Sequence, residues 1–407
     1  MIKDVLIDAN GDEFRLAVLE NGEPSEVHIE RNDGKSLVGN IYRGKVMRVM
    51  PGIQSAFVDI GLDKNAFLSV KDLIPWDFES LDDSSGKDTY PDISGLLRQG
   101  NEISVQVTKD ASGSKGPRVT ANLSFPGWYA VLMPGCNVCG ISKKIEDKEA
   151  RKRLKRAAAG LKPDNCGLIL RTAAQDADDV PISEEIKNLL NIWSNVKRLE
   201  EKGRVPRLLY SGPGSLEQAV REHLTSGINK IIVNDKEIYD KIISVLELAE
   251  PGLKAKVELY SKDYDMFEYY HVQSAIREAL SRKVWMKSGA YLVFDYTEAL
   301  TVIDVNSGKL SSNNDPEETA FSINMEAAEA IAKQIRLRNL SGIIIIDFID
   351  MKRDEHRDQV VRTLKSHVKN DRIKTTVLGM TKLGLVEMTR KKVKNPLHVL
   401  MSDNNKL

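Results

Sequence analysis

The sequence lacks any long uninterrupted run of hydrophobic residues. A helix that crosses a membrane needs about 20 consecutive, predominantly apolar residues, and polar or charged residues break every apolar stretch here well before that length. The first residues, Met1 to Glu13, mix aspartate, asparagine and glycine with apolar residues, so they do not have the continuous core of a signal peptide. We therefore expect no membrane span and a cytoplasmic location.

Cysteine is also scarce. The 407 residues include only Cys136, Cys139 and Cys166, and so small and odd a number argues against a disulfide framework. Cys136 and Cys139 have the spacing of half a zinc site, but no second cysteine pair supplies the four ligands of a closed site. We interpret them as small apolar residues near a turn, and we do not expect structural zinc.

The chain has no excess of either charge, because 59 basic residues balance 59 acidic ones. A protein that grips a polyanion usually shows a basic excess, so the overall balance gives no support for nucleic-acid binding, and any such site must be local. The six histidines are scattered without metal-ligand spacing. The length of 407 residues predicts two to four domains.

Short β-strands are predicted throughout the first 120 residues. The first group is a meander with Asn-Gly turns at Asn10-Gly11 and Asn21-Gly22. It is too small to bury a core of its own, so it must pack on a later part of the chain. A second group lies between Gly39 and Val119 and predicts a small barrel of the OB type. The expected strands cover residues 2–8, 14–19, 26–30, 41–49, 55–59, 66–69 and 102–108.

A loop and then a change of pattern follow the barrel strands. Residues 77–95 are rich in aspartate, serine and glycine, which predicts a mobile loop. Beyond Pro126, helical periodicity alternates with short apolar runs, and the last third predicts a layered α/β domain. Its expected strands cover 290–295, 300–304, 342–347 and 375–378, and its helices 317–338 and 354–369.

Two of these predicted strands end in aspartate. Asp304 ends one buried strand and Asp347 another, so both carboxylates emerge at the same rim if the strands are neighbours. Such a pair suits a hard cation, Mg²⁺ or else Mn²⁺, which activates water and stabilises charge on a phosphodiester. Asn306 projects to the same face if its strand continues. The alternative is that both aspartates only mark strand ends.

Other candidate residues lie in the barrel and in the middle of the chain. Phe57 and Phe67 would stack nucleic-acid bases if the barrel exposes them. The alternative is that both belong to the barrel core. Lys109 and Lys115 border a glycine-containing loop and are within reach of backbone phosphates. Arg171-Thr172 follows the end of a predicted strand and offers hydrogen-bond donors to a phosphate. The alternative is that the pair only marks the end of the strand.

Five motifs together resemble the ribonuclease E/G family, and the resemblance runs from Met1 to about Pro396. They occur in the order typical of that family, which is far more specific than one short pattern. The motifs are residues 39–46 (GNIYRGKV), 56–61 (AFVDIG), 298–308 (EALTVIDVNSG), 317–320 (EETA) and 346–351 (IDFIDM).

The resemblance implies a multidomain fold of α/β and β parts. A ribonuclease-H-like subdomain, interrupted by an S1-type OB barrel and a 5′-sensor region, would precede a deoxyribonuclease-I-like catalytic subdomain. The expected ranges are 1–38 and 216–280 for the ribonuclease-H-like parts, 39–125 for the barrel, 126–215 for the sensor, 281–396 for the catalytic subdomain and 397–407 for a tail without a zinc link.

The resemblance also implies roles for residues. Asp304 and Asp347 match the family's magnesium ligands, and Asn306 matches its catalytic asparagine. Phe57, Phe67 and Lys115 match RNA contacts of the barrel. The residues matching the pocket for a 5′-terminal monophosphate are Gly127, Val131, Lys143, Arg171, Thr172 and Lys374.

The implied activity is cleavage of single-stranded RNA to 5′-phosphate and 3′-hydroxyl ends, in ribosomal RNA processing or messenger RNA decay. Lys143 and Lys374 stand where the family commonly has arginine, and lysine attracts phosphate but lacks the bidentate fork, so a strong preference for 5′-monophosphate ends is not expected from the resemblance alone. A homodimer is compatible with the resemblance, whereas a zinc-linked assembly is not expected. The alternatives are a non-catalytic RNA-binding protein that uses the barrel and a metal-dependent deoxyribonuclease.

Overall fold

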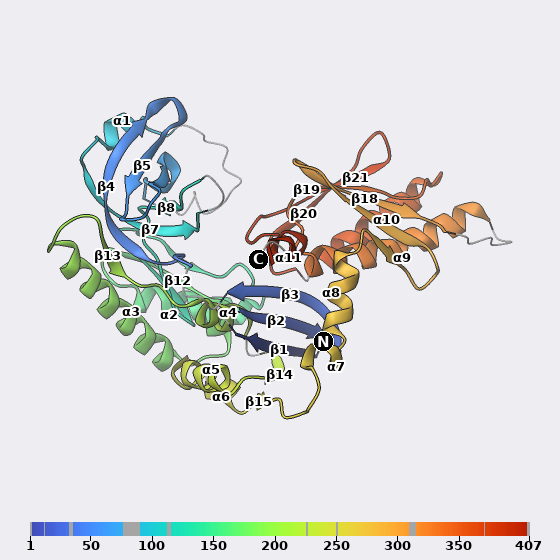
Figure 1. The fold of residues 1–407 in the computed structure, drawn as a ribbon, viewed down its shortest axis with the longest axis horizontal. Coiled ribbons are helices and arrows are strands. Elements are labelled where there is room, and N and C mark those ends of the chain that lie inside the picture. The colour runs from blue at the N-terminus through green and yellow to red at the C-terminus, as the bar shows by residue number, and fades with distance from the viewer. Residues whose placement is uncertain are drawn as a thin grey trace. The chain divides into compact units, whose positions relative to one another are not determined.

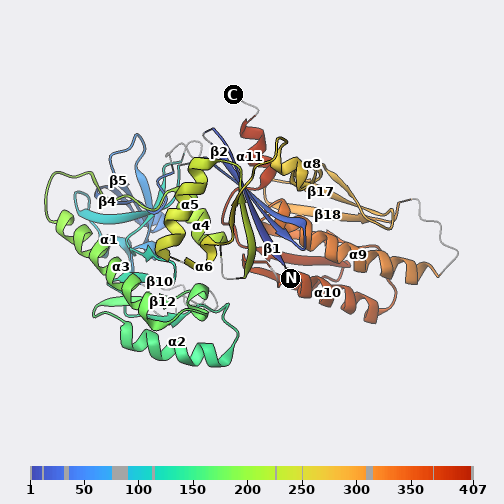
Figure 2. The same ribbon diagram turned by 90° about the horizontal axis from the view of Figure 1, so that it is seen from below.

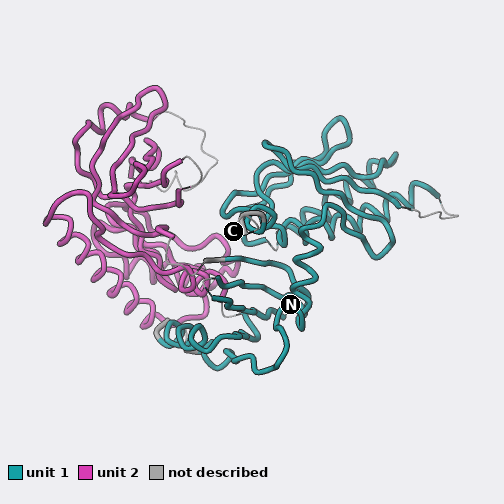
Figure 3. Tube along the Cα trace, in the orientation of Figure 1, with its two compact units in different colours: residues 1–31, 227–407 teal, residues 32–226 magenta. Residues whose placement is uncertain are grey.

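The structure is a computed structural model, and it describes residues 2–11, 13–31, 36–75, 90–111, 115–224, 227–249, 251–308, 315–369 and 371–404. The chain forms two compact units (Figure 3). Unit 1 combines residues 1–31 with residues 227–407, and unit 2 comprises residues 32–226. In the described part of the chain, no helix has both the length and the apolar character that a membrane crossing requires.

The N-terminal meander of unit 1 belongs to a five-stranded sheet (Figure 1). Its strand β1 runs antiparallel to β2 and parallel to β14, more than 200 residues later in the chain. The expectation that the meander packs on a later segment is therefore confirmed. The sheet order is β15 (Val257–Leu259), β14 (Ile228–Val233), β1 (Lys3–Asn10), β2 (Glu13–Glu20) and β3 (Glu23–Arg31).

Helices α7 (Met266–Tyr269) and α8 (Val272–Leu280) share a hydrophobic core with this sheet. The segment expected to be a tail forms helix α11 (Leu397–Asn404), whose first residue is buried in the same core. Further helices of unit 1 are α5 (Lys236–Ala249) and α6 (Pro251–Lys254).

The last third of the chain forms a six-stranded sheet with two long helices on one face (Figure 2). The helices are α9 (Pro316–Leu337) and α10 (Asp354–Val368). Strand β21 was not predicted, yet it lies between β19 and β20 and pairs with both. The sheet order is β16 (Lys283–Trp285), β17 (Tyr291–Tyr296), β18 (Leu300–Asn306), β19 (Gly342–Asp347), β21 (Leu385–Arg390) and β20 (Thr375–Met380).

Unit 2 contains a closed five-stranded barrel, which confirms the prediction of an OB-type domain. Closure comes from pairing of β4 with β7, and β13 (Arg207–Tyr210) adds to β4 from outside. The barrel strands are β4 (Ile41–Met50), β5 (Ser55–Asp59), β6 (Ala66–Ser69), β7 (Glu102–Lys109) and β8 (Arg118–Thr120). The expected loop at residues 77–95 lies mostly outside the described residues, and its last part includes the short helix α1 (Ile93–Leu96).

The rest of unit 2 is a four-stranded sheet with helices. Its order is β11 (Cys139–Ile141), β12 (Cys166–Leu170), β10 (Ala130–Pro134) and β9 (Phe125–Pro126). The helices are α2 (Lys148–Leu161), α3 (Asp179–Glu200) and α4 (Ser215–His223). The buried Cys136 packs with Met133 and Val138, as expected for a small apolar residue near a turn.

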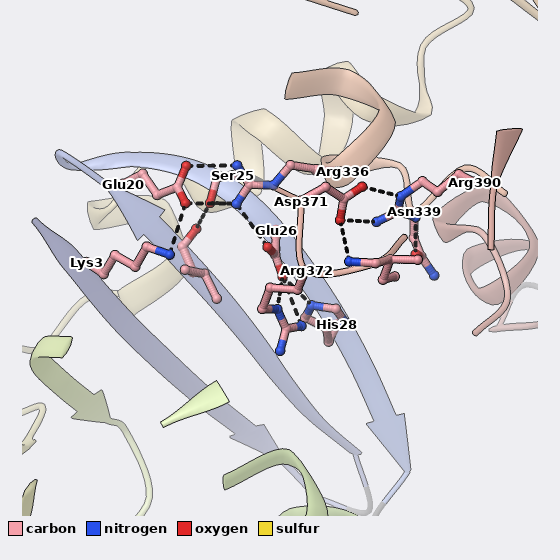
Figure 4. Close-up of polar contacts among 12 residues, drawn as sticks. Lys3, Glu20, Ser25, Glu26, His28, Arg336, Asn339, Asp371, Arg372 and Arg390 are labelled. Atoms are coloured by element: carbon pink, nitrogen blue, oxygen red, sulfur yellow. Dashed lines mark hydrogen bonds and ion pairs between the residues drawn. The ribbon is translucent and has the colours of Figure 1, made fainter. Parts of the chain in front are cut away.

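A buried arginine ties helix α9 to the meander within unit 1 (Figure 4). The guanidinium of Arg336 donates to both carboxylate oxygens of Glu20, at 2.9 and 2.8 Å, and to Glu26 at 2.9 Å. Burial alone would lower the pKa of Arg336, but the hydrogen bonds and charges of the two carboxylates raise it above its ordinary value. Further partners of the two carboxylates are Lys3, 3.6 Å from Glu20, and Arg372 and His28, 3.1 and 3.2 Å from Glu26.

We expect Arg336→Met to lower the free energy of unfolding by about 3 kcal/mol. Removing one partner of a buried ion pair generally costs about 3–5 kcal/mol, and the low end applies because Lys3 and Arg372 still face the two carboxylates. Urea unfolding followed by circular dichroism measures the change.

The matched control is Arg277→Met. Arg277 lies 3.2 Å from Glu268, and these side chains are 62% and 53% exposed, so this pair contributes at most about 1 kcal/mol. Equal unfolding midpoints for the two variants would contradict a structural role for the buried network.

Candidate functional site

Two carboxylates meet where strands β18 and β19 end. The strands are parallel neighbours, and their register places Asp304 directly opposite Asp347. The condition set by the sequence argument, that the two strands lie side by side, is therefore met. Strand β18 continues to Asn306, so the asparagine lies on the same face as Asp304, one pleat further along.

Alternation along both strands decides which face these polar residues occupy. Ile303, Val305, Ile344 and Ile346 are buried in the core that helices α9 and α10 share with the sheet. Because successive side chains of a strand point to opposite faces, the two aspartates and Asn306 point away from the helices. The polar residues thus occupy the face that the helices leave open.

Hydrogen bonding and charge define the electrostatics of this cluster. The Nδ2 of Asn306 donates to Oδ2 of Asp304 at 2.7 Å, which fixes the orientation of that carboxylate. Burial raises the pKa of the Asp347 carboxyl, and the negative charges of Asp304 and Asp350 raise it further. Because a bound cation would relieve this repulsion, and because carboxylate and amide oxygens are hard ligands, the residues fit a divalent cation such as Mg²⁺.

Asp350 was missed by the sequence argument, although it lies only three residues after Asp347 in a motif that was singled out. The segment that carries it is held by the fully buried Asn324 of helix α9. Asn324 Nδ2 donates to the carbonyl oxygen of Ile349 at 2.8 Å, and Ile349 N donates back to Asn324 Oδ1 at 3.0 Å. A polar residue on the buried side of a helix is the sequence signal that points to such a contact.

A second side chain of α9 holds the same segment further along. Glu317 accepts hydrogen bonds from the backbone N–H groups of Lys352 and Arg353, at 2.8 and 3.1 Å, and lies 3.0 Å from Nδ1 of His356. The backbone donors chiefly, and His356 in addition, lower the pKa of Glu317 against a smaller opposing effect of burial. Glu317, the first residue of the motif at 317–320, therefore has a structural role, because its hydrogen bonds hold the segment that follows Asp347.

The barrel presents its two phenylalanines on the outside. Phe57 and Phe67 lie opposite each other on β5 and β6, with ring centroids 6.1 Å apart in an edge-to-face arrangement. Both rings are partly exposed, while the alternating residues of these strands are buried: Ala56, Val58, Ala66 and Leu68. The alternative that both phenylalanines belong to the barrel core is therefore wrong.

Cations flank this aromatic pair in the strand register. Arg48 lies opposite Phe57, Arg118 lies opposite Phe67, and the predicted Lys109 lies opposite Arg118. Neither Arg48 nor Arg118 was among the predicted residues. The pairing of β6 with β8, which brings in Arg118, joins segments that are distant in the sequence, whereas Arg48 comes from the adjacent strand of a hairpin. Lys115 is exposed and precedes Gly116, whose Cβ position would clash with the backbone oxygen of Asn65 at the start of β6.

Three of the expected sensor residues, Gly127, Arg171 and Thr172, lie at or next to a loop that Glu185 of α3 holds in place. The Glu185 carboxylate accepts from the backbone N–H groups of Trp128, Tyr129 and Ala130. A Cβ at Gly127 would lie 2.4–2.7 Å from the same carboxyl group, so a larger residue would displace Glu185 from these hydrogen bonds. This close approach gives a physical reason for the glycine at that position.

Arg171 and Thr172 lie next to this loop at the end of β12. Arg171 Nη1 donates to the carbonyl oxygen of Gly127, and burial chiefly lowers the pKa of its guanidinium. Arg171 lines a cavity of about 320 Å³ together with Arg221, which was not predicted. Thr172 Oγ1 lies 3.3 Å from Ser142 Oγ.

The other expected sensor residues are more dispersed. Val131 is on β10, half-buried, and pairs with Ile169. Lys143 is exposed and lines a different cavity, of about 340 Å³, with Arg151 and Lys155 of the basic helix α2. Lys374 belongs to unit 1, just before β20, so its participation in the same pocket stays a prediction.

Comparison with known proteins gives a consistent result. The family model described as the ribonuclease E/G family matches residues 124–393. Ribonuclease G of Salmonella typhimurium is 39% identical over 404 residues, which cover 99% of this chain and 83% of that protein. Ribonuclease G of Haemophilus influenzae is 40% identical, covering 98% and 82%. Ribonuclease E of Escherichia coli is 34% identical, covering 96% of this chain but 37% of that protein. The chain therefore belongs to the ribonuclease E/G family.

Proposed function

We propose that this endoribonuclease hydrolyses single-stranded RNA with Mg²⁺ as its metal ion and leaves 5′-phosphate and 3′-hydroxyl ends. The observation that carries the proposal is the register of β18 and β19, which places Asp304 opposite Asp347. Asn306 adds an amide on the same open face. Such a set of hard oxygen ligands on an accessible face is what a metal-assisted phosphodiester hydrolase requires.

Each residue has a separate task in this proposal. Asp304 and Asp347 hold the cation, which when bound polarises the phosphodiester and makes water a better nucleophile. Asn306 keeps the Asp304 carboxylate in one orientation through its 2.7 Å hydrogen bond. Asn324 and Glu317 hold the segment after Asp347, so this carboxylate does not have to be ordered at the moment of reaction.

Two surfaces of unit 2 support binding of the RNA. On the barrel, the exposed rings of Phe57 and Phe67 provide stacking faces, and Lys109 and Lys115 provide charge for the backbone. The Arg171 guanidinium, one nitrogen of which donates to Gly127, provides further donors suited to a 5′-terminal phosphate.

The architecture and setting form part of the same proposal. We assign the five-stranded sheet to a ribonuclease-H-like subdomain and the six-stranded sheet to a deoxyribonuclease-I-like subdomain, with ribosomal RNA precursors and messenger RNA as cytoplasmic substrates. Relatives named ribonuclease G and the metal-suited aspartate pair support this assignment.

Asp304→Asn and Asp347→Asn should each reduce cleavage of a single-stranded RNA oligomer by at least about 1,000-fold, because one ligand of the cation is lost. Binding of the same RNA should persist, since the barrel surface is untouched. Gel analysis with Mg²⁺ or with EDTA measures cleavage, and fluorescence anisotropy measures binding.

The matched control is Asp295→Asn. Asp295 lies on the same face of the sheet, opposite Val302, but its carboxylate is paired with Arg282 at 2.6 and 2.8 Å. The cleavage rate of Asp295→Asn should stay within about twofold of the wild-type rate.

If the Asp304 and Asp347 variants cut RNA as fast as this control, the assigned active site is wrong. If the wild-type protein binds RNA but never cuts it, the protein is an RNA-binding module. Cleavage of single-stranded DNA at the RNA rate would instead indicate a general nuclease.

Glu317→Gln should lower kcat about tenfold with little change in KM, because displacement of reacting groups by a fraction of an ångström is enough for such a loss. It should also alter the pH dependence of stability. Because the folded-state pKa of Glu317 is lowered, its contribution is fully present above pH 4.5 and disappears as the pH falls through the lowered value. The stability difference between wild type and variant should therefore vanish in acid.

The control for this experiment is the neighbouring residue. Glu318 pairs with Arg353 at the surface, where both side chains are about half exposed, so Glu318→Gln should leave kcat unchanged. Steady-state kinetics and urea unfolding at several pH values distinguish the two variants. A kcat loss shared by both would refute the specific role of Glu317.

RNA with a 5′-monophosphate should be cut about tenfold faster than RNA with a 5′-hydroxyl, and Arg171→Lys should reduce this ratio toward one. The expected factor corresponds to about one charge-assisted hydrogen bond, and lysine keeps the charge but loses the fork. The 5′-hydroxyl RNA is the internal control, because its rate should not change in the variant. Equal wild-type rates on both RNAs would rule out a working end sensor.

A further inference from the structure

Two aromatic side chains lie on the same face of the six-stranded sheet as the aspartate pair. Trp285 on β16 lies opposite Tyr291 on β17, and Tyr291 lies opposite Asn306 on β18. Directly opposite residues of neighbouring strands share a face of the sheet. Trp285, Tyr291 and Asn306 therefore form one continuous row, which ends beside Asp304.

Trp285 is unusually exposed for a tryptophan. Its side chain is 62% exposed, whereas its chain neighbours Val284 and Met286 are 3% and 8% exposed and belong to the core beneath the sheet. The buried neighbours fix the strand, so the indole faces solvent because of the strand pairing and not because the segment is loose. Tryptophan is highly buried on average, and a rigidly presented, exposed indole is typical of a binding surface.

A lysine completes the cluster. Nζ of Lys283 lies 3.4 Å from the ring centroid of Tyr291 and 3.9 Å from that of Trp285, and the two ring centroids are 5.1 Å apart. In the described part of the chain Lys283 makes no ion pair, whereas its neighbour Arg282 is paired with Asp295. The cluster thus offers aromatic faces and an ammonium group that no carboxylate neutralises.

We propose that Lys283, Trp285 and Tyr291 form a stacking platform for a nucleobase of the single-stranded RNA, close to the cleaved bond. The inference rests on the function proposed above. A ligand with flat rings and a negative backbone matches both features of the cluster, the aromatic faces and the positive charge. Strands are about 4.8 Å apart, so Tyr291 is one strand and Trp285 two strands from Asn306, within reach of a nucleotide next to the scissile phosphate.

The platform gives the six-stranded sheet its own contact with RNA, independent of the barrel. Stacking tolerates any base, because every base has an aromatic face. The platform would therefore set the position of the chain relative to the aspartates without reading the sequence.

The test uses RNA oligomers in which a single abasic nucleotide replaces each position around one cleavage site in turn. For wild type, kcat/KM should fall about tenfold when the abasic nucleotide occupies one particular position next to the cleaved bond. Trp285→Leu should lose about the same factor on intact RNA and nothing further on that abasic RNA, because both changes remove the same contact. Trp285→Phe should retain most of the activity.

Leu378→Ala is the matched control, since Leu378 is 61% exposed on β20, at the opposite edge of the same sheet. Its kcat/KM and its abasic profile should equal those of wild type. Trp285→Gln provides a second variant of different polarity, and circular dichroism and the urea midpoint check that each variant is folded.

If Trp285→Leu and Trp285→Gln still lose activity on the abasic RNA by the same factor as wild type, the two losses are additive and the platform is wrong. This outcome would leave the proposed function intact. Absence of Mg²⁺-dependent cleavage by wild type would instead refute the proposed function itself. Light scattering at the assay concentration tests whether a second copy of the chain covers this face instead. A change of molecular mass in the Trp285 variants, with an unchanged abasic profile, would assign the face to a second copy and overturn the proposal.

Discussion

The parallel register of β18 and β19 is the constraint on which the candidate site depends. Because the side-chain period of a strand is two, a slip of one residue would move Asp347 to the face covered by helices. The register is held by the apolar residues that alternate with the polar ones: Ile303, Val305, Ile344 and Ile346. The hydrophobic core thus determines where the carboxylates meet, and the site has little freedom to form in any other way.

Helix α9 connects this site to the stability of unit 1. Its middle and N-terminal part hold the segment after Asp347 through Asn324 and Glu317. Its C-terminal end carries Arg336, which bonds to Glu20 and Glu26 of the meander. One rigid helix therefore contacts both the segment beside the carboxylates and the five-stranded sheet, so residues far from the open face contribute to the geometry there.

How much the sequence could predict depends on the range of the interactions involved. Strands β18 and β19 were predictable because each contains an apolar run that leads to an aspartate. Their pairing was only a condition of the prediction, because the connection through α9 is long enough for a parallel βαβ crossover but does not require the two strands to be neighbours. Strand β21 was missed because Val386 and Met388 are its only buried apolar residues and alternate with Glu387 and Thr389, a weak signal whose meaning depends on two partner strands.

The aromatic residues show the same limit. Residues along the strand of Phe57 alternate between two faces, and the sequence does not show which face is inside. Only the closed barrel determines that Phe57 lies on the outer face. Trp285 carries no local signal at all, since its place in the same row as Asn306 results from the pairing of three strands. The roles of Gly127 and Lys143 came from family resemblance, and the clash between a Cβ at Gly127 and Glu185 requires coordinates.

The distribution of charge explains why the chain is neutral overall and still suited to a polyanion. Asp304, Asp347 and Asp350 repel phosphate until a cation is bound, and a lysine placed directly beside them would pair with the carboxylates and compete with that cation. Aromatic stacking avoids this conflict, because it attracts a base without neutralising a metal ligand. Tyr291 and Trp285 continue the row of Asn306 on β17 and β16, and Lys283 belongs to β16, two strands away from the strand of Asp304, with its ammonium group over the two rings. Attraction of RNA and retention of the metal can therefore operate on one sheet face.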